Sequence, residues 1–278
     1  MRTKLLKLRW IAAFLVGAFL PAASYADFSL TNINIADFAT LINEFSANSH
    51  YSTVNSASSI GGLGSFELGV VGGITKAPDT LALVKRNDPG TSFKDILPHG
   101  AILGRVGVPY GITAELLWLP KIKAQNISLN RWGLGAQWTM TDNVLDGMGI
   151  PVAIALKGFY TKTSLKYSQT ISTVPADIDL TNSLWGLMAL TSYKVWIFDP
   201  YVGIGYTAAK GDLTVTANTP VQLLAYLPSS TSQSTGSSPT SAQFQVGTDI
   251  TLAFFSLGLE YVNVFSKNNY NARLSFRF

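Results

Sequence analysis

The chain has 278 residues, of which 47% are hydrophobic and 13% are charged, with 20 Lys and Arg against 16 Asp and Glu. The charged share is about half that of an average soluble domain. Together with a positive mean hydropathy (+0.24) it excludes a disordered chain and argues against a cytosolic enzyme with a solvated exterior. The absence of Cys excludes a disulfide scaffold, a Cys-ligated metal site and a thiol nucleophile.

Residues 1–26 have the three parts of an export signal. Four basic side chains precede an apolar segment at 10–20, and small residues follow up to Ala26, where a signal peptidase would cleave. Eleven apolar residues are too few for a membrane-spanning helix, which needs about 20. We expect a mature chain that starts at Asp27. Its bases and acids balance at 16 each, so no basic patch for nucleic acid remains.

Residues 27–64 form a separate N-terminal segment ahead of the predicted strands. Within it, apolar side chains recur at spacings of three and four, at Ile35, Phe38, Ile42 and Phe45. This spacing predicts a short amphipathic helix over 34–46.

From residue 65 to the C-terminus the apolar pattern has period two, which is typical of strands with one apolar and one polar face. It predicts ten strands, within a range of 8–12. We place them at about 65–77, 101–108, 111–120, 126–140, 151–165, 178–193, 200–215, 242–253, 256–266 and 269–278.

The connections alternate between short turns and mostly longer loops at 78–100, 121–125, 166–177 and 216–241. Ten of the 13 residues from Ser229 to Ser241 are Ser or Thr, so we expect that part of the last loop to be mobile and solvated, after an apolar run at 221–227. Alternating connection lengths are typical of bacterial transmembrane barrels. The even strand count predicts that both mature termini lie in the periplasm and the loops outside the cell.

No second apolar run is long enough for a spanning helix, so a membrane protein of this composition must be a closed barrel, in which every backbone amide is paired. The sequence therefore predicts an all-β fold, a closed antiparallel transmembrane β-barrel over 65–278. Aromatic residues near the strand ends are expected to lie at the two membrane interfaces.

The final strand carries a more specific signal. In residues 270–278, Tyr270, Phe276 and Phe278 lie on an apolar face that alternates with polar residues and ends on an aromatic. This segment resembles the C-terminal signature of Gram-negative outer-membrane β-barrels, in which it is read by the barrel assembly machinery. Residues 37–72 more loosely resemble uncharacterised outer-membrane barrels and, more distantly, fatty-acid transporters, whose N-terminal motif is absent here. The resemblance implies an outer-membrane location and contact with lipid, but no activity.

The opposite strand faces place four acids and five bases in the barrel interior, or lumen, beside many glycines. These lumen-lining candidates are Glu67, Arg105, Glu115, Arg131, Lys157, Asp249, Glu260, Arg273 and Arg277. Buried charges are costly unless paired, so one hypothesis is an ion-pair network that fills the lumen. The alternative is a narrow polar channel or ligand site. The helix over 34–46 could lie beneath the barrel or enter it as a plug.

The sequence predicts a barrel that passes or binds small molecules, apolar ones included. The alternative is a non-conducting structural or surface-interaction barrel. A hydrolase using His99 is a third hypothesis, but we expect no enzyme, because the chain has only two His and no nucleophile, phosphate or zinc motif. We expect no metal and no cofactor.

Overall fold

The computed structural model of the chain describes residues 35–87, 89–90, 93–124, 126–142, 151–171, 174–221 and 230–278. The predicted export signal at 1–26 and the apolar run at 222–227 lie outside these residues. None of the helices in the described residues is long and apolar enough to cross a membrane.

The helices of the described residues are α2 (Ile35–Asn48), α3 (Pro78–Asn87) and the short 3-10 helix η1 (Met140–Asp142). The strands are β1 (Phe66–Lys76), β2 (Ile96–Val108), β3 (Ile112–Ala124), β4 (Ile127–Thr139), β5 (Ala153–Ile171), β6 (Val174–Ser192), β7 (Phe198–Val221), β8 (Ser230–Ser237), β9 (Thr240–Leu252), β10 (Phe255–Val264) and β11 (Lys267–Arg277).

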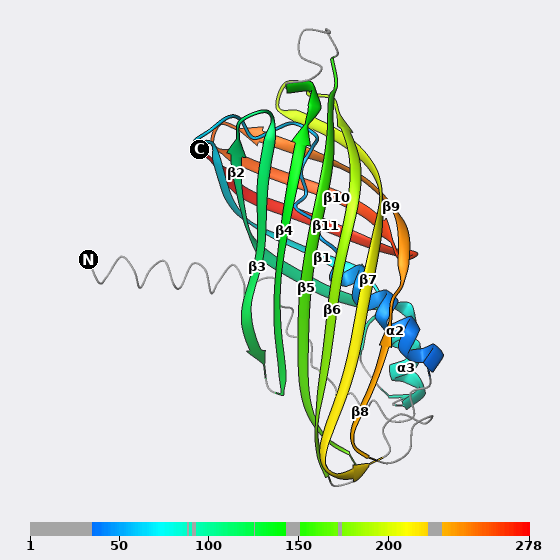
Figure 1. Cartoon of the computed structure of the whole chain (residues 1–278). Helices are drawn as coiled ribbons and strands as arrows, with labels where there is room; N and C mark the ends of the chain where they lie inside the picture. The colour runs from blue at the N-terminus through cyan, green and yellow to red at the C-terminus, as the bar shows by residue number, and fades with distance from the viewer. Residues whose placement is uncertain are drawn as a thin grey trace, which may run out of the picture.

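Ten of these strands form a closed antiparallel barrel (Figure 1). Neighbouring strands follow chain order from β1 to β7 and continue through β9, β10 and β11. The ring closes because β11 pairs with β1, from Glu67↔Arg277 to Thr75↔Asn269. The predicted fold class, an all-β closed barrel of about ten strands with an N-terminal helix, is confirmed.

The two ends of the barrel differ. We call the end with the short connections and the C-terminus the turn end, and the opposite end, which carries α2 and α3, the loop end (Figure 1). At the loop end, β5, β6 and β7 have 19, 19 and 24 residues, whereas β10 and β11 have 10 and 11. The long strands therefore extend beyond the short ones as a loop-end wall, formed by residues 162–171, 174–183, 210–221 and 230–237.

This wall corrects two predicted loops. Residues 166–177 belong to a β5–β6 hairpin paired as far as Ile171↔Val174. The Ser- and Thr-rich segment is not a mobile loop, because β8 pairs with β7 from Gly211↔Ser237 onward. The composition of this segment predicted a loop, but Thr is also common in strands, and the long strand β7 extends far enough to pair with this polar segment.

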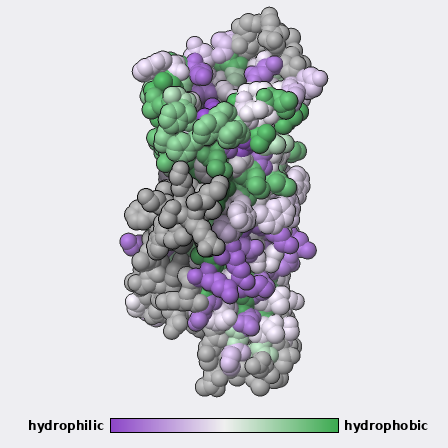
Figure 2. Space-filling view, turned by 90° about the vertical axis from the view of Figure 1, so that its left-hand side faces the viewer, coloured by the Kyte–Doolittle hydropathy of each residue, from purple (hydrophilic) through white to green (hydrophobic). Residues whose placement is uncertain are grey.

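The outer surface carries an apolar band on its turn-end side, and more polar side chains toward the loop end (Figure 2). An aromatic row borders the band toward the loop end and consists of exposed or half-exposed Trp118, Trp132, Tyr160, Trp185, Tyr206, Phe244, Tyr261 and Tyr270. Aromatics also cluster at the turn end, among them Trp138, Trp196 and Phe198. From Phe198 to Tyr206, eight residues at about 3.3 Å each on a strand tilted by about 40° span about 20 Å, close to the ~25 Å apolar band of transmembrane barrels.

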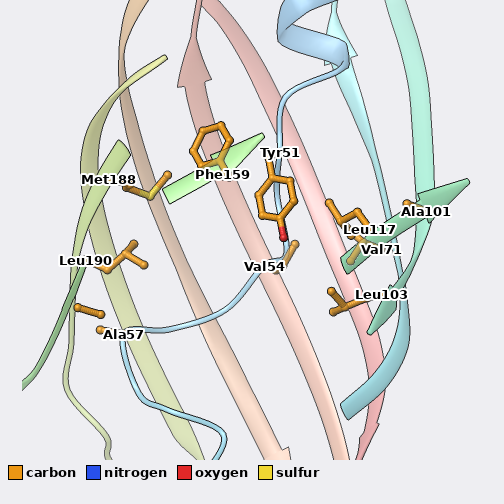
Figure 3. Packing of buried hydrophobic residues seen from close by; sticks show 11 residues of the cluster. Tyr51, Val54, Ala57, Val71, Ala101, Leu103, Leu117, Phe159, Met188 and Leu190 are labelled. Atoms are coloured by element: carbon orange, nitrogen blue, oxygen red, sulfur yellow. The ribbon is translucent and has the colours of Figure 1, made fainter. Parts of the chain in front are cut away.

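The barrel interior is occupied by the chain itself. Residues 49–60, in the connection between α2 and β1, pass through the lumen, and Tyr51, Val54 and Ala57 pack there among apolar side chains of five strands (Figure 3). We call residues 49–57 the plug; all of them are buried. Helix α2 lies at the loop-end mouth, where Phe38 and Ile42 pack on the inner face of β6 and β7. The helix thus closes the mouth, and the segment after it fills the lumen.

Candidate functional site

The nine charged residues that the strand pattern assigns to the lumen lie on inward faces, and all except Arg277 are buried. Seven of them form one connected set of ion pairs. Glu67 is central to it: its carboxylate lies 2.9 Å from Arg105 Nη1, 3.2 Å from Arg273 Nη1 and 3.1 Å from Arg277 Nη2.

The network extends to both sides of Glu67. Arg273 and Arg277 also contact Asp249, at 2.7 and 3.4 Å. On the other side, Glu115 lies 3.2 Å from Arg105 Nε and 2.8 Å from Lys157 Nζ. Three carboxylates and four cations are therefore paired inside the barrel, and each charge has at least one opposite partner, as buried charges require.

Strand register explains why these charges meet. Glu67 is directly opposite Arg277 on one neighbouring strand and Arg105 on the other, and Arg105 is opposite Glu115. Charges of alternating sign thus stand side by side on β11, β1, β2 and β3. Cross-strand neighbours of opposite charge attract each other.

Glu260 and Arg131 do not join this network; neither forms an ion pair with any described residue. Glu260 accepts hydrogen bonds from Ser52 Oγ at 2.5 Å, Tyr201 Oη at 3.0 Å and Asn271 Nδ2 at 3.2 Å. Arg131 Nη2 donates to the backbone carbonyl of His50. Both side chains thus contact the plug rather than an opposite charge.

The plug binds the wall through polar contacts on several sides. Tyr51 donates to Glu115 and stacks on Phe159, with ring centroids 5.2 Å apart. Asn55 Nδ2 donates to Gln137 Oε1 at 2.7 Å, and Lys157 Nζ donates to Asn55 Oδ1 at 3.0 Å.

Near the turn end, the Ser56 and Ser58 hydroxyls both donate to Asp199, at 2.6 and 2.7 Å. The lumen charges and the plug thus form one hydrogen-bonded body.

Sequence reasoning did not identify the plug residues. The segment is rich in Ser, Thr and Asn and has no clear period. One usable signal was the inward-facing glycine pair Gly133 and Gly135 on β4, which leaves space beside the wall. The Tyr51 ring occupies that space, and a Cβ added at Gly135 would meet Tyr51 Oη at 2.6 Å.

Helices α2 and α3 are tied together at the loop end. Glu44 of α2 accepts the backbone N–H groups of Asp79 and Thr80 at 2.9 and 2.7 Å, which caps the N-terminus of α3. Lys267 of β11 lies 2.9 Å from the same carboxylate. Arg86 and Asp37 pair at 2.5 Å on the outside, and this hydrogen bond raises the pKa of the Arg86 guanidinium.

The residues of the predicted assembly signal lie on the outer face of β11 or just after it. Tyr270, Phe276 and Phe278 are exposed, and Phe278 stacks on Phe66 with centroids 5.0 Å apart. These aromatic side chains therefore belong to the apolar outer surface of the closed barrel.

Comparison with known sequences places this architecture in a family. Residues 18–278 match DUF6588, described as a family of unknown function. The chain belongs to the DUF6588 family. No curated protein sequence matches it.

Among solved structures, this DUF6588 member is similar to the attachment invasion locus protein Ail of Yersinia pestis, with 11% identity and a TM-score of 0.32 over 77% of this chain and 97% of Ail. It is also similar to the translocator domain of autotransporter NalP from Neisseria meningitidis, with 11% identity and a TM-score of 0.37 over 77% and 87% of the two chains. The transport unit of autotransporter AIDA-I from Escherichia coli matches at 10% identity and a TM-score of 0.25 over 89% and 99%.

The two histidines of this DUF6588 barrel lie inside it without a catalytic arrangement among the described residues. His99 contacts the side-chain amides of Asn48 and Asn271 at 3.0 and 2.7 Å. His50 makes no side-chain hydrogen bond there. Neither imidazole is held against a carboxylate, and no cluster of three or more His, Asp or Glu in the described part of the chain could hold a metal ion.

Proposed function

We propose that this protein is an outer-membrane barrel which its own N-terminal segment keeps closed, and which acts at the cell surface through its loop-end wall rather than as an open pore. The observation that carries this proposal is the plug. Residues 49–57 are buried in the lumen and bonded to strands on several sides. In the described part of the chain, these buried side chains lie across the path that a solute would take through the lumen.

The surface role follows from the loop-end wall. Beyond the aromatic row, the outer face of this wall carries charged and hydroxyl side chains, including Lys162, Lys166 and Lys210. The alternating pattern thus changes from apolar to polar at the level where headgroups would end. With the C-terminus in the periplasm, this wall and the two helices stand outside the cell, where they contact polar surfaces or molecules.

Conductance tests the closure. We expect the purified barrel in a planar lipid bilayer to show no discrete current steps. A variant whose residues 49–57 are replaced by a Gly-Ser segment of equal length should conduct, provided that heat-modifiable gel migration shows a folded barrel. Asp179→Asn, which alters the loop-end wall only, should remain silent. Regular ohmic steps from the wild type would refute the proposal.

Passage of small molecules is the second candidate function. The inner face of the strands around the plug is polar and rich in glycine, and barrels with a water-filled interior also have a polar inner face. Passage would require the plug to leave. Since the chain has no Cys, Ser56→Cys with Asp199→Cys would create a single pair that can lock the plug to β7. Liposomes that contain this variant are placed in solutions of small sugars. Swelling that occurs with the reduced pair and stops when the pair is oxidised would favour passage. No swelling in either redox state favours the closed barrel.

A further inference from the structure

Strands β2 and β3 separate toward the loop end, which leaves a seam in the barrel wall. Their pairing runs from Val108↔Ile112 only to Ile102↔Trp118. Beyond that point β2 continues to Ile96 paired with β1 alone, and β3 continues to Ala124 paired with β4 alone (Figure 1). No strand in the described part of the chain fills the gap between them.

A small cavity lies in the lumen behind this seam. It has a volume of about 10 Å³, room for about one water-sized group. It is lined by residues from the plug and from four strands, namely His50, Ser52, Val71, His99, Gly100, Ala101, Leu117 and Arg131. Its ionisable side chains are thus one guanidinium and two imidazoles, with no carboxylate among them.

Three side-chain nitrogens of the residues that line this cavity lack hydrogen-bond partners in the described structure. Arg131 is 6% exposed and its Nε makes no hydrogen bond in the described structure; His50 is 4% exposed and both of its ring nitrogens are unbonded there. Buried polar groups without partners are rare, and a buried charge without one is costly. Two such groups facing one cavity point to a ligand that accepts hydrogen bonds and carries negative charge.

Register explains why Arg131 has no acidic partner among the described residues. Its cross-strand neighbours are Leu119 on β3 and Thr163 on β5, whereas Arg105, at the corresponding place in the network, lies between two glutamates. Of the five lumen cations, the other four each contact a carboxylate. Glu260, the one predicted lumen acid that forms no ion pair with a described residue, accepts hydrogen bonds from Ser52, Tyr201 and Asn271.

We infer that His50 and Arg131 form a binding site for a small monovalent anion, no larger at its charged end than a carboxylate group. The small volume of the cavity, about one water-sized group, favours the smallest anions. Two sources share this chemistry: a free ion such as chloride or acetate, and the carboxylate of an amphiphile whose tail leaves through the β2–β3 seam. The inference goes beyond closure of the lumen, since a closed barrel needs no ligand.

Anion-dependent stability of the full-length mature barrel tests the site. The thermal unfolding midpoint is measured in detergent at fixed ionic strength, with gluconate as the bulky reference anion. Gluconate is then replaced stepwise by chloride, acetate or octanoate. A ligand bound only by the folded state raises this midpoint with its concentration. We expect a saturable rise for the wild type with acetate, and a response to octanoate at lower concentration if the tail occupies the seam.

Variants assign the effect to the site. Arg131→Met should abolish the rise, Arg131→Lys should retain part of it, and His50→Leu should weaken it at least tenfold in concentration. Lys121→Gln removes an exposed cation of β3 and should respond like the wild type. In gluconate alone, Arg131→Met should be at least as stable as the wild type, because it removes an unpaired buried charge.

The outcomes separate cleanly. A response to octanoate at lower concentration than to acetate assigns an amphiphile, and a response to chloride or acetate at the same or lower concentration than to octanoate assigns a free ion. No response of the wild type to any of the three anions, or an equal response of Arg131→Met, would overturn the inference. Either result leaves the conductance test of closure unaffected.

Discussion

Replacement of Glu67 by Gln tests the lumen network at its centre. The substitution keeps the shape of the side chain and removes the charge that faces Arg105, Arg273 and Arg277 at 2.9 to 3.2 Å. Loss of one partner from a buried ion pair costs about 3–5 kcal/mol. Here each arginine keeps a second carboxylate, Glu115 or Asp249, so we expect the lower limit, about 3 kcal/mol.

The assay is urea unfolding of the barrel in liposomes or detergent. With a urea m-value of about 3 kcal/mol/M, the upper end for small proteins, a loss of about 3 kcal/mol lowers the midpoint by about 1 M. Asp179→Asn is the matched control. Its carboxylate pairs with Lys166 at 2.5 Å, but the two side chains are 37% and 61% exposed, and such surface pairs contribute only about 0–1 kcal/mol. Equal midpoints for the two variants would show that water screens the lumen charges and would refute the buried network.

Three further predictions concern the outer face, the final residue and the plug. Leu134→Arg places a charge in the apolar band and should cost about 2–4 kcal/mol of unfolding free energy, whereas Ser164→Arg, beyond the aromatic row, should be nearly neutral; equal costs would contradict the position of the band. Phe278→Asp should reduce the amount of barrel in the outer membrane, measured by heat-modifiable migration, through failed assembly rather than instability, and normal accumulation would exclude that role. Gly135→Ala should cost about 1–3 kcal/mol, because its Cβ would overlap the plug, while Gly104→Ala, with open space around it, should not change the urea midpoint.

Period-two alternation was sufficient to predict the barrel, because inward and outward positions are fixed by parity once a strand is recognised. The same parity placed Glu67, Arg105 and their partners on one interior surface. The pairing itself could not be predicted, because it depends on register between strands that are distant in sequence. Arg131 illustrates this: parity places it in the lumen, but register gives it leucine and threonine neighbours.

Two features could not be predicted from the sequence: the position of the helix and the path of the plug. The helix itself was predictable from its spacing, at 34–46 against the observed Ile35–Asn48, but its position depends on contacts with β6 and β7 that no local pattern encodes. The plug has neither helical nor strand periodicity, because most of its polar side chains bond to the surrounding wall rather than within a regular element. The first described residue, Ile35, lies at the loop end, opposite Phe278. The predicted placement of both mature termini on one side also concerns residues 27–34, which lie outside the described structure.

The path of the chain through its own barrel constrains how the molecule can be built. Helix α2 lies beyond one mouth and β1 starts at the other, so the segment between them is threaded through the ring. An α-helix with its side chains is about 10–12 Å wide, so drawing α2 through a finished, filled lumen would be very slow. The ring closes through Glu67 and Arg277, 210 residues apart, and contacts that distant form late. Pairing of β1 with β11 therefore has to close the ring around a segment that already lies inside it, so the plug takes part in building the barrel as well as in filling it.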